Sequence, residues 1–307
     1  MKCQQFRGGP KPSSPRKFSV IIPTQGRLSI RQAVTSVLAQ TFPEFEVIVV
    51  SDGLDLPTPA ILQDFLSDSR VRLVEQASSG VARARNTGAS TAGGDWITFL
   101  DDDDQAKPDW LETWSEFANE ADIVTARVAI SRADGHRHTV ACWLNVSDPT
   151  VGAASLLASG FALRRDLFFA VGGYDECLHY SENTDLGLRL CDHLRKLGMP
   201  DLVRHSELVV SDIYVEKPKS RLTRYGIQRG RAARHMLRIH AERFAQEPQH
   251  MGGYLNISSR AYRDEGNPIM AIKEAWRAIL LNWRDRASWK SLAISVFPSR
   301  YQKGHSG

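Results

Sequence analysis

The sequence of 307 residues predicts an α/β fold, in which a mostly parallel β-sheet is flanked by helices and followed by an α-helical C-terminal extension. Two observations support this prediction. Apolar, β-branched runs alternate with segments of helical apolar spacing through the N-terminal third of the chain, which is typical of parallel sheets covered on both faces. Three of these runs end in polar residues, and such sheets bind their ligands at the carboxyl ends of the strands.

The predicted elements alternate along the chain. Strands are expected at 18–24, 45–50, 71–74 and 96–100, with helices at 30–40, 60–66 and 80–89 between them. The helix over 30–40 is indicated by apolar side chains at helical spacing, namely Ile30, Ala33, Val34, Val37 and Leu38. Further along, we expect strands at 123–130 and 159–165, a hairpin turn at 134–135 and a helix over 185–197.

Four consecutive aspartates, Asp101 to Asp104, directly follow the apolar run that ends at Leu100. At ~5 Å and an effective dielectric constant of ~20, each adjacent pair of carboxylates repels by roughly 3 kcal/mol. Solvent, basic side chains or a divalent cation must offset this repulsion. Hard oxygen ligands suit Mg²⁺ or Mn²⁺, which also bind phosphate oxygens. The alternative is a solvated acidic loop that binds no ligand.

Seven short motifs occur in order along the chain: 19–27 (SVIIPTQGR), 36–41 (SVLAQT), 49–53 (VVSDG), 80–88 (GVARARNTG), 99–104 (FLDDDD), 172–176 (GGYDE) and 182–186 (ENTDL). In these motifs and in their order the chain resembles the family 2 glycosyltransferases of the GT-A fold, over roughly 18–215. The resemblance implies a transferase that uses a nucleotide-sugar donor, a UDP-sugar as the first expectation.

The resemblance also implies roles for the acidic run, which corresponds to the family's DxD motif. Asp103 would bind the divalent cation, Mn²⁺ or Mg²⁺, and Asp101 would lie beside the ribose of the donor. Asp102 would occupy the variable middle position or share the cation. Asp104 would support these residues from behind or cap the helix that follows Pro108. His205 is a candidate for the third metal ligand that some GT-A enzymes have.

The remaining donor-binding residues implied by the resemblance lie at strand ends and on the helix over 80–89. Pro23, Thr24 and Arg27 follow the first strand, and the first two would contact the base through the backbone. Asp52 would accept a hydrogen bond from the base, or else form the turn at Gly53. Arg83 would approach the ribose or the diphosphate. Arg85 is the second candidate for that role, and both arginines have the alternative role of surface charges, whereas Asn86 is expected to be structural.

The sequence departs from the family at the catalytic base. Inverting members use a carboxylate to deprotonate the acceptor hydroxyl as it attacks the anomeric carbon, and the second residue of the family's "ED" pair usually has this role. Here that position is Asn183, and an amide cannot take the proton. Glu182 is the first substitute and Asp185 the second, although Asp185 could simply favour the dipole of its helix. Another group, a substrate-assisted route or a degenerate site remains open.

Composition and segment character suggest three regions: a flexible tail over 1–17, a GT-A glycosyltransferase domain over 18–215 and a basic helical region over 216–307. The four cysteines show no metal-ligand spacing, which favours free thiols in a reducing compartment. No apolar run approaches the ~20 residues that span a bilayer. We therefore expect a cytoplasmic protein, with peripheral membrane contact as an option.

The C-terminal region carries a basic stretch and a repeat-like segment. Lysines and arginines recur with helical character over 217–238, which suits contact with anionic lipid or a charged acceptor, although such a stretch is more often a solvated helix face. The segment 254–293 resembles one tetratricopeptide unit. One unit cannot bury its apolar face alone, so docking or homo-oligomer formation is expected there, or a plain helical cap. No motif supports binding to nucleic acid.

These inferences predict a metal-dependent, inverting glycosyltransferase with a hydroxyl acceptor, which is a glycan, a lipid-linked group or a small molecule. One alternative is a nucleotidyltransferase of similar fold, which would typically carry a glycine- and lysine-rich loop where this chain has the segment 23–27. The other is an inactive transferase-like scaffold with a helical interaction module, which Asn183 supports and the complete donor half opposes.

Overall fold

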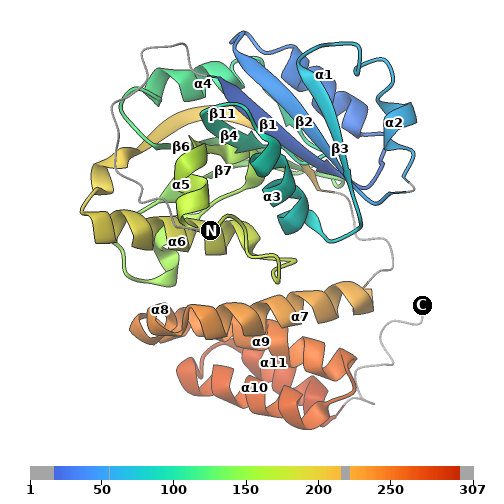
Figure 1. Cartoon of the computed structure of the whole chain (residues 1–307). Coiled ribbons are helices and arrows are strands. Elements are labelled where there is room, and N and C mark those ends of the chain that lie inside the picture. The colour runs from blue at the N-terminus through green and yellow to red at the C-terminus, as the bar shows by residue number, and fades with distance from the viewer. Residues whose placement is uncertain (1–16, 55, 216–221, 298–307) are drawn as a thin grey trace. The chain divides into compact units, whose positions relative to one another are not determined.

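The computed structural model describes residues 17–54, 56–215 and 222–297, with the side chains of 222–225 left out (Figure 1). The predicted tail over 1–17 lies outside the described residues except for Lys17. The chain divides into two compact units. The first comprises Met1–Asp148, Ala153–Glu176 and Glu182–Lys217, and the second comprises Pro149–Gly152, Cys177–Ser181 and Pro218–Gly307.

The first unit opens with strands and helices in alternation, as the sequence predicts. Strands β1, β2, β3 and β4 pair in parallel, in the spatial order β3-β2-β1-β4. These elements are β1 (Phe18–Thr24), α1 (Ile30–Leu38), β2 (Phe45–Asp52), α2 (Thr58–Ile61), β3 (Val71–Gln76), α3 (Val81–Thr91) and β4 (Trp96–Phe99). The helix predicted over 60–66 is shorter than expected, because residues after Ile61 form turns.

The strand order reverses between β1 and β4. From β1 the chain adds β2 and then β3 on one side, and it returns across the sheet to place β4 on the other side of β1. Because parallel crossovers are right-handed, the reversal puts α3 on the opposite face of the sheet from α1, as Figure 1 shows. The carboxyl ends of β1 and β4 therefore flank a topological switch point, where open α/β sheets bind ligands.

The rest of the first unit extends this sheet with strands of both directions. Strand β10 runs antiparallel to β4 and β6, and β11 runs parallel to β6. Two further strands are antiparallel to their partners: β5 pairs with β11, and β7 pairs with β6. The sheet is therefore mixed, and its N-terminal half is parallel. The elements are β5 (Gln105–Ala106), α4 (Trp110–Phe117), β6 (Ile123–Arg132), β7 (Arg137–Ala141), β10 (Phe161–Arg164), α5 (Arg165–Ala170), α6 (Glu182–Leu197) and β11 (Val203–Val215).

Short elements complete the first unit. A two-stranded sheet pairs β8 (Trp143–Leu144) with β9 (Ala154–Ser155), and 3₁₀ turns lie at Ala158–Gly160 and Pro200–Leu202; a further 3₁₀ turn, Val151–Ala153, begins in the segment 149–152 of the second unit. The predicted hairpin turn at 134–135 joins β6 and β7, and Gly135 adopts the positive φ of 86° that such a turn requires. Helix α6 begins at Glu182, three residues before the predicted start at Asp185.

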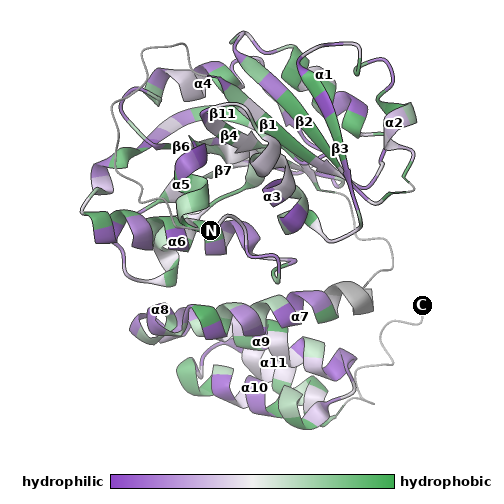
Figure 2. Ribbon diagram, in the orientation of Figure 1, coloured by the Kyte–Doolittle hydropathy of each residue, from purple (hydrophilic) through white to green (hydrophobic). Residues whose placement is uncertain are grey.

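The core of the first unit follows from the apolar runs. Every residue of β1 and of β2 is buried, and Figure 2 shows both strands as largely hydrophobic. On α3, Gly88 allows the helix to approach the sheet, since an added Cβ would lie 2.4 Å from Cγ2 of Ile21. Continuous burial on both faces is the property that made these strands readable as central parallel strands.

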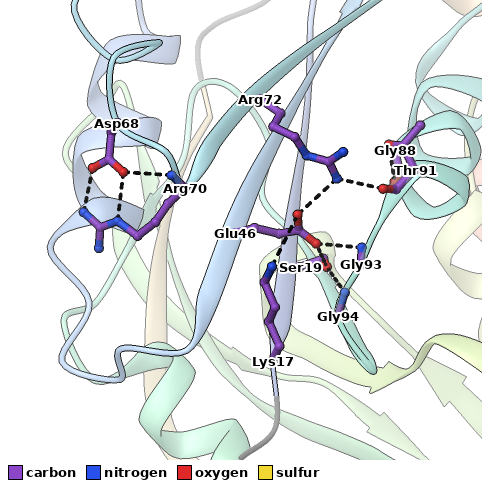
Figure 3. Close-up of polar contacts among 10 residues, drawn as sticks. All are labelled: Lys17, Ser19, Glu46, Asp68, Arg70, Arg72, Gly88, Thr91, Gly93 and Gly94. Carbon is purple, nitrogen blue, oxygen red and sulfur yellow. Dashed lines mark hydrogen bonds and ion pairs between the residues drawn. The ribbon is translucent and has the colours of Figure 1, made fainter.

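One buried carboxylate ties the N-terminal ends of this core together (Figure 3). Glu46 accepts hydrogen bonds from Ser19 Oγ (2.7 Å) and from the Gly93 N–H (2.7 Å), and its second oxygen lies 3.0 Å from Arg72 Nη2. Burial by itself would raise the pKa of Glu46, but these donors, with Lys17 at 3.8 Å, outweigh it and lower the pKa. The charged form is therefore the one that stabilises the fold.

We expect Glu46→Gln to lower the free energy of unfolding at pH 7 by about 2 kcal/mol, the scale of hydrogen bonds to a charged group. The pKa of Glu46 is lowered in the folded state, so this stabilisation is present above the ordinary value of 4.5 and is lost as the pH falls through the folded pKa. Denaturant unfolding of both proteins at neutral and at acidic pH measures it. A difference that stays constant between the two would contradict the assignment.

The second unit is helical. Its elements are α7 (Leu222–Ile239), α8 (Ala241–Gln246), α9 (Pro248–Asp264), α10 (Pro268–Leu281) and α11 (Arg286–Val296). Helix α7 packs closely on α9, because a Cβ added at Gly230 would lie 1.9 Å from Cβ of Ala261. Ala275, Ile279 and Leu292 form a small apolar cluster between α10 and α11. None of the described helices is both long enough and apolar enough to cross a bilayer.

Candidate active site

The acidic segment, Asp101 to Asp104, lies beside the end of β1. The Leu100 N–H donates to the carbonyl oxygen of Ile21 (3.1 Å), which holds the segment next to the last residues of β1. Thr24 Oγ1 then donates a 2.6 Å hydrogen bond to Oδ2 of Asp102, which is buried. The sheet thus brings together two groups that the sequence separates by 78 residues.

Arg27 neutralises the outer part of the acidic segment. Its Nη1 lies 2.7 Å from Oδ2 of Asp103 and 3.3 Å from Oδ1 of Asp102. Burial would lower the pKa of Arg27, but the carboxylates of Asp102 and Asp103 reverse this and raise it, so the guanidinium keeps its charge. Arg27 and Asp103 are both partly exposed, which leaves this pair accessible from solvent.

Burial also shifts the carboxylates themselves. It raises the pKa values of Asp102 and Asp103, while Arg27 partly opposes the shift in each. Asp104 is more deeply enclosed: burial, reinforced by Asp101 and its other neighbours, raises its pKa to about 8. Its Oδ1 accepts a hydrogen bond from the Tyr214 N–H of β11 (3.1 Å), whereas Asp109 occupies the position before α4. Asp104 therefore supports the segment from behind and does not cap the helix.

A buried arginine joins the acidic segment to the start of α6. Arg85 is 2% exposed; its Nη2 lies 2.6 Å from Oδ1 of Asp101 and its Nη1 lies 2.9 Å from Oε1 of Glu182. Burial would lower the pKa of Arg85, but the nearby carboxylates raise it. Its guanidinium also lies 5.3 Å from the centre of the Tyr174 ring, a cation–π arrangement. The guanidinium of Arg85 therefore holds the carboxylates of Asp101 and Glu182 in position, one at each terminal nitrogen.

Arg83 does not share this position. Two residues apart on an α-helix correspond to a rotation of about 200°, so Arg83 and Arg85 leave α3 on opposite sides. The side chain of Arg83 is 57% exposed and its Nε lies 4.0 Å from a carboxylate oxygen of Glu176. Asn86 is structural, as predicted, because its side chain bonds both the N–H and the carbonyl oxygen of Tyr174.

The two carboxylates considered for the catalytic base, and Asn183 between them, have different surroundings. Glu182 is the first residue of α6 and its carboxylate faces Arg85. Asn183 Oδ1 accepts a 2.8 Å hydrogen bond from the hydroxyl of Tyr174. Asp185 is fully buried, and one of its oxygens accepts from two nitrogens of Arg189, at 2.9 and 2.6 Å. Of the two carboxylates, Glu182 is the one joined to the acidic segment.

Asp52 holds the loop that leads into α3. Its Oδ1 accepts from Gln76 Nε2 and from the Ser79 N–H, each at 2.8 Å, and its Oδ2 accepts from the Gly80 N–H at 2.9 Å. Asp52 is buried at the carboxyl end of β2, one strand away from Pro23 and Thr24. None of these three hydrogen bonds involves Gly53, so Asp52 does more here than form the turn at Gly53.

The acidic segment offers a donor set that suits a hard divalent cation. Its carboxylate oxygens match the preference of Mg²⁺ or Mn²⁺, and a cation would offset the burial and repulsion that raise the pKa values of Asp102 and Asp103. In the part of the chain that the structure describes, no three His, Cys, Asp or Glu side chains form a ready ligand set.

His205 lies apart from the acidic segment. His205 belongs to β11 and lies opposite Thr125 of β6, and its Nδ1 shares a 3.0 Å hydrogen bond with Thr125 Oγ1. Asp104 bonds to β11 at Tyr214, nine residues after His205. The structure thus does not bring His205 to the predicted metal position.

Sequence reasoning gave too little weight to Arg85 and did not consider Tyr174 as part of the site. Arg85 falls in an alternating Arg-x-Arg pair, and a helical projection that placed Ala82 and Ala89 in the core would have put Arg85 near that face. Tyr174 had no comparable signal, because its role comes from contacts with Arg85 and Asn183.

The fold and the site together define an α/β protein with an acidic segment at the switch point of its sheet. Comparison with known proteins gives the class more closely. Residues 19–159 match the model of the family described as Glycosyl transferase family 2. Glycosyltransferase GlyA of Streptococcus pneumoniae is 34% identical over 99 residues, which are 32% of this chain and 14% of GlyA. The chain spans less than a third of the length of the first relatives that it matches.

Solved structures share the fold at low sequence identity. The crystal structure of TarS 1–349 from S. aureus has a TM-score of 0.59 and 18% identity, and covers 95% of this chain and 93% of TarS 1–349; the same protein was also solved with UDP-GlcNAc. The mannosyltransferase PcManGT from Pyrobaculum calidifontis, in complex with GDP-Man and Mn²⁺, has a TM-score of 0.55 and 17% identity, and covers 96% and 84%.

Residues 19–159 thus match the family 2 glycosyltransferase model, over less than half of the chain, and the solved structures confirm the predicted α/β fold of the GT-A type. The helical C-terminal extension is confirmed as well.

Proposed function

We propose that the protein is a metal-dependent, inverting glycosyltransferase of the hexosyltransferase type, which moves a sugar from a UDP-linked donor to a hydroxyl acceptor. The acceptor would be a glycan, a lipid-linked group or a small molecule. The observation that carries the proposal is the bridge made by Arg85. Because one buried guanidinium contacts both Asp101 and Glu182, a carboxylate that can act as a base lies next to the segment that would bind the donor.

The donor would lie across the carboxyl ends of β1, β2 and β4. Pro23, Thr24 and Asp52 would contact the base, and Asp101 would contact the ribose. Asp103 would bind Mn²⁺ or Mg²⁺, with Asp102 held by Thr24 beside it. When bound, the cation would supply Lewis-acid stabilisation of the negative charge on the departing diphosphate.

The two arginines near the donor path would have different roles. Arg27 faces the acidic segment and would contact the diphosphate, after separating from Asp103. Arg83 stays a prediction for the ribose or the diphosphate, from an exposed position on α3.

Glu182 would act as the general base. Its carboxylate would take the proton of the acceptor hydroxyl as that oxygen attacks the anomeric carbon, while the bond from the anomeric carbon to the diphosphate oxygen breaks. A single displacement of this kind inverts the anomeric configuration. Ser181, directly before Glu182, has a φ of 62° in the left-handed region, and non-glycine residues in that region cluster at functional sites.

We also propose that α9 and α10 form one tetratricopeptide-like unit. They are joined by the three residues 265–267, and small side chains such as Ala261, Ala271 and Ala275 are buried between helices. Helix α11 then covers α10 as the first helix of a following unit would.

Release of nucleoside diphosphate from a panel of UDP- and GDP-sugars tests the proposed function. We expect release from a UDP-sugar with Mn²⁺ or Mg²⁺ and none after chelation by EDTA. Anomeric configuration in the product, followed by NMR, tests inversion. Pyrophosphate release from a nucleoside triphosphate and a sugar phosphate would indicate the nucleotidyltransferase. Normal binding of UDP and Mn²⁺ without turnover of any donor would favour the inactive scaffold.

A further inference from the structure

Helix α10 has two apolar stripes, and one of them faces outward. Ala271, Ala275 and Ala278 are buried against the neighbouring helices. Ile269 and Leu280, by contrast, are 78% and 81% exposed, and both belong to the row 269, 273, 276, 280, which lies along one side of the helix. Figure 2 shows hydrophobic and hydrophilic residues interspersed along α10. A helix of this kind buries one stripe on folding and leaves the second for another contact.

Three tryptophans extend the outward stripe towards α11. The rings of Trp276 and Trp289 meet edge to face at 6.0 Å, and Trp289 Nε1 donates a 2.7 Å hydrogen bond to the carbonyl oxygen of Trp283. Trp283 itself is 67% exposed. We call Ile269, Trp276, Leu280, Trp283 and Trp289 together the tryptophan face. The Trp276–Trp289 contact and the Trp289–Trp283 hydrogen bond hold three partly exposed tryptophans close together, unlike single exposed apolar residues, which are normal.

The charged side chains around the tryptophan face are basic. The exposed charged residues of α10, α11 and the turn between them are Lys273, Arg277, Arg284, Arg286 and Lys290. The two acidic residues of this segment are engaged: Glu274 is buried against Arg277, and Asp285 accepts hydrogen bonds from Asn256 and from the start of α11. The surface therefore combines exposed indole rings with positive charge.

We propose that the tryptophan face docks on the surface of an anionic membrane. Tryptophan suits the membrane–water interface, because its ring is apolar and its N–H is polar. Apolar side chains flanked by lysine and arginine are the composition of surfaces that lie in the interface plane. Each basic residue near an anionic leaflet contributes about 1 kcal/mol, which corresponds to roughly a fivefold gain in affinity.

A second copy of the chain fits this surface less well. A two-fold dimer places the same patch of both subunits face to face, so the five basic residues of one copy would oppose those of the other. Like charges brought together in this way weaken association.

Two residues of the basic stretch on α7, which the sequence suggested for lipid contact, make contacts with neighbouring side chains of the second unit, whereas Arg231 of the same stretch is 71% exposed. Arg234 lies 2.9 Å from a carboxylate oxygen of Glu265 and stacks 4.1 Å from the centre of the Tyr262 ring. Arg229 lies over the ring of Tyr180, at 5.8 Å. These residues pack within the second unit, whereas the earlier part of the stretch, 217–221, lies outside the described residues.

Co-sedimentation of the full chain with vesicles tests the proposal. We expect binding to vesicles that contain a substantial share of phosphatidylglycerol, weaker binding to phosphatidylcholine alone, and release at high salt. Tryptophan fluorescence should shift to the blue on binding. Leu280→Ser with Trp283→Ser should weaken binding by at least about tenfold. Lys273→Gln with Lys290→Gln should weaken it by about 25-fold.

Matched controls keep the result specific. Leu208→Ser removes an exposed apolar side chain from β11, and Lys196→Gln removes an exposed charge from α6; both should bind vesicles like the parent. Absence of vesicle binding at low salt, or equal binding by parent and variants, would overturn the proposal. A concentration-dependent dimer that dissociates in the same variants, without vesicle binding, would assign the face to a second copy. Donor hydrolysis, measured without vesicles, reports separately on the proposed function.

Discussion

Glu182→Gln should leave donor binding intact and reduce turnover by about 10² to 10⁴, the usual scale for loss of a general base. The substitution removes the proton acceptor while keeping the length of the side chain. The glutamine Oε1 can still accept from Nη1 of Arg85, where Glu182 now accepts at 2.9 Å, so the bridge to Asp101 should persist. Steady-state kinetics measure turnover, and calorimetry with UDP and Mn²⁺ measures donor-side affinity.

Asp185→Asn is the matched comparison, since it makes the same chemical change three residues later on α6. Asp185 is fully buried and paired with Arg189, so its neutralisation should lower the melting temperature rather than act on the chemical step. Near-normal turnover in Glu182→Gln, together with a large loss in Asp185→Asn at unchanged stability, would move the base to Asp185. Loss in neither variant would point to a substrate-assisted route.

Asp103→Asn should abolish Mn²⁺-dependent binding of the donor, the second large effect that we expect. An amide is a poorer ligand for a hard cation than a carboxylate, and the proposed site has few protein ligands to share the loss. Calorimetric titration of UDP in the presence and absence of Mn²⁺ measures it directly. We expect the gain in UDP affinity that Mn²⁺ provides to disappear in the variant.

Arg27→Met distinguishes loss of Mn²⁺ binding from loss of the ion pair between Arg27 and Asp103. Asp103→Asn also weakens the 2.7 Å contact with Arg27, and that change alone could rearrange the segment. If Asp103 binds the cation, Arg27→Met should leave Asp103 free for Mn²⁺ and retain a Mn²⁺-dependent gain in UDP affinity. The same gain in Asp103→Asn as in the parent would refute the ligand assignment.

Much of the fold was predictable because burial leaves a direct imprint on sequence. The residues of β1 and β2 are all buried, so both strands have mainly apolar sequences, interrupted at Ser19 and Glu46, that end in polar residues. The sequence predicted a mostly parallel sheet, whereas the strand order β3-β2-β1-β4 and its switch point are findings of the structure. Strand β10 lies antiparallel between β4 and β6, and the sequence carried no signal for this placement. A short strand with a neighbour on each side has a similar composition whether those neighbours are parallel or antiparallel to it.

The candidate site was predictable in part. The acidic segment and Thr24 were expected at one edge of the sheet, and they are hydrogen-bonded there. The choice between Arg83 and Arg85 could not be made from residue type. It depends on which side of α3 faces the sheet, and the structure buries Arg85.

The sequence by itself determined the class of fold and indicated the edge of the sheet where we propose that a donor binds, because buried strands and strand-end motifs are local properties of the chain. The tertiary structure alone decided which charges meet. Arg85 and Glu182 are 97 residues apart, and their contact exists because β4, α3 and α6 pack around one buried guanidinium that needs two carboxylates to offset its desolvation. The outward tryptophan face is likewise visible only once the buried stripe of α10 is known.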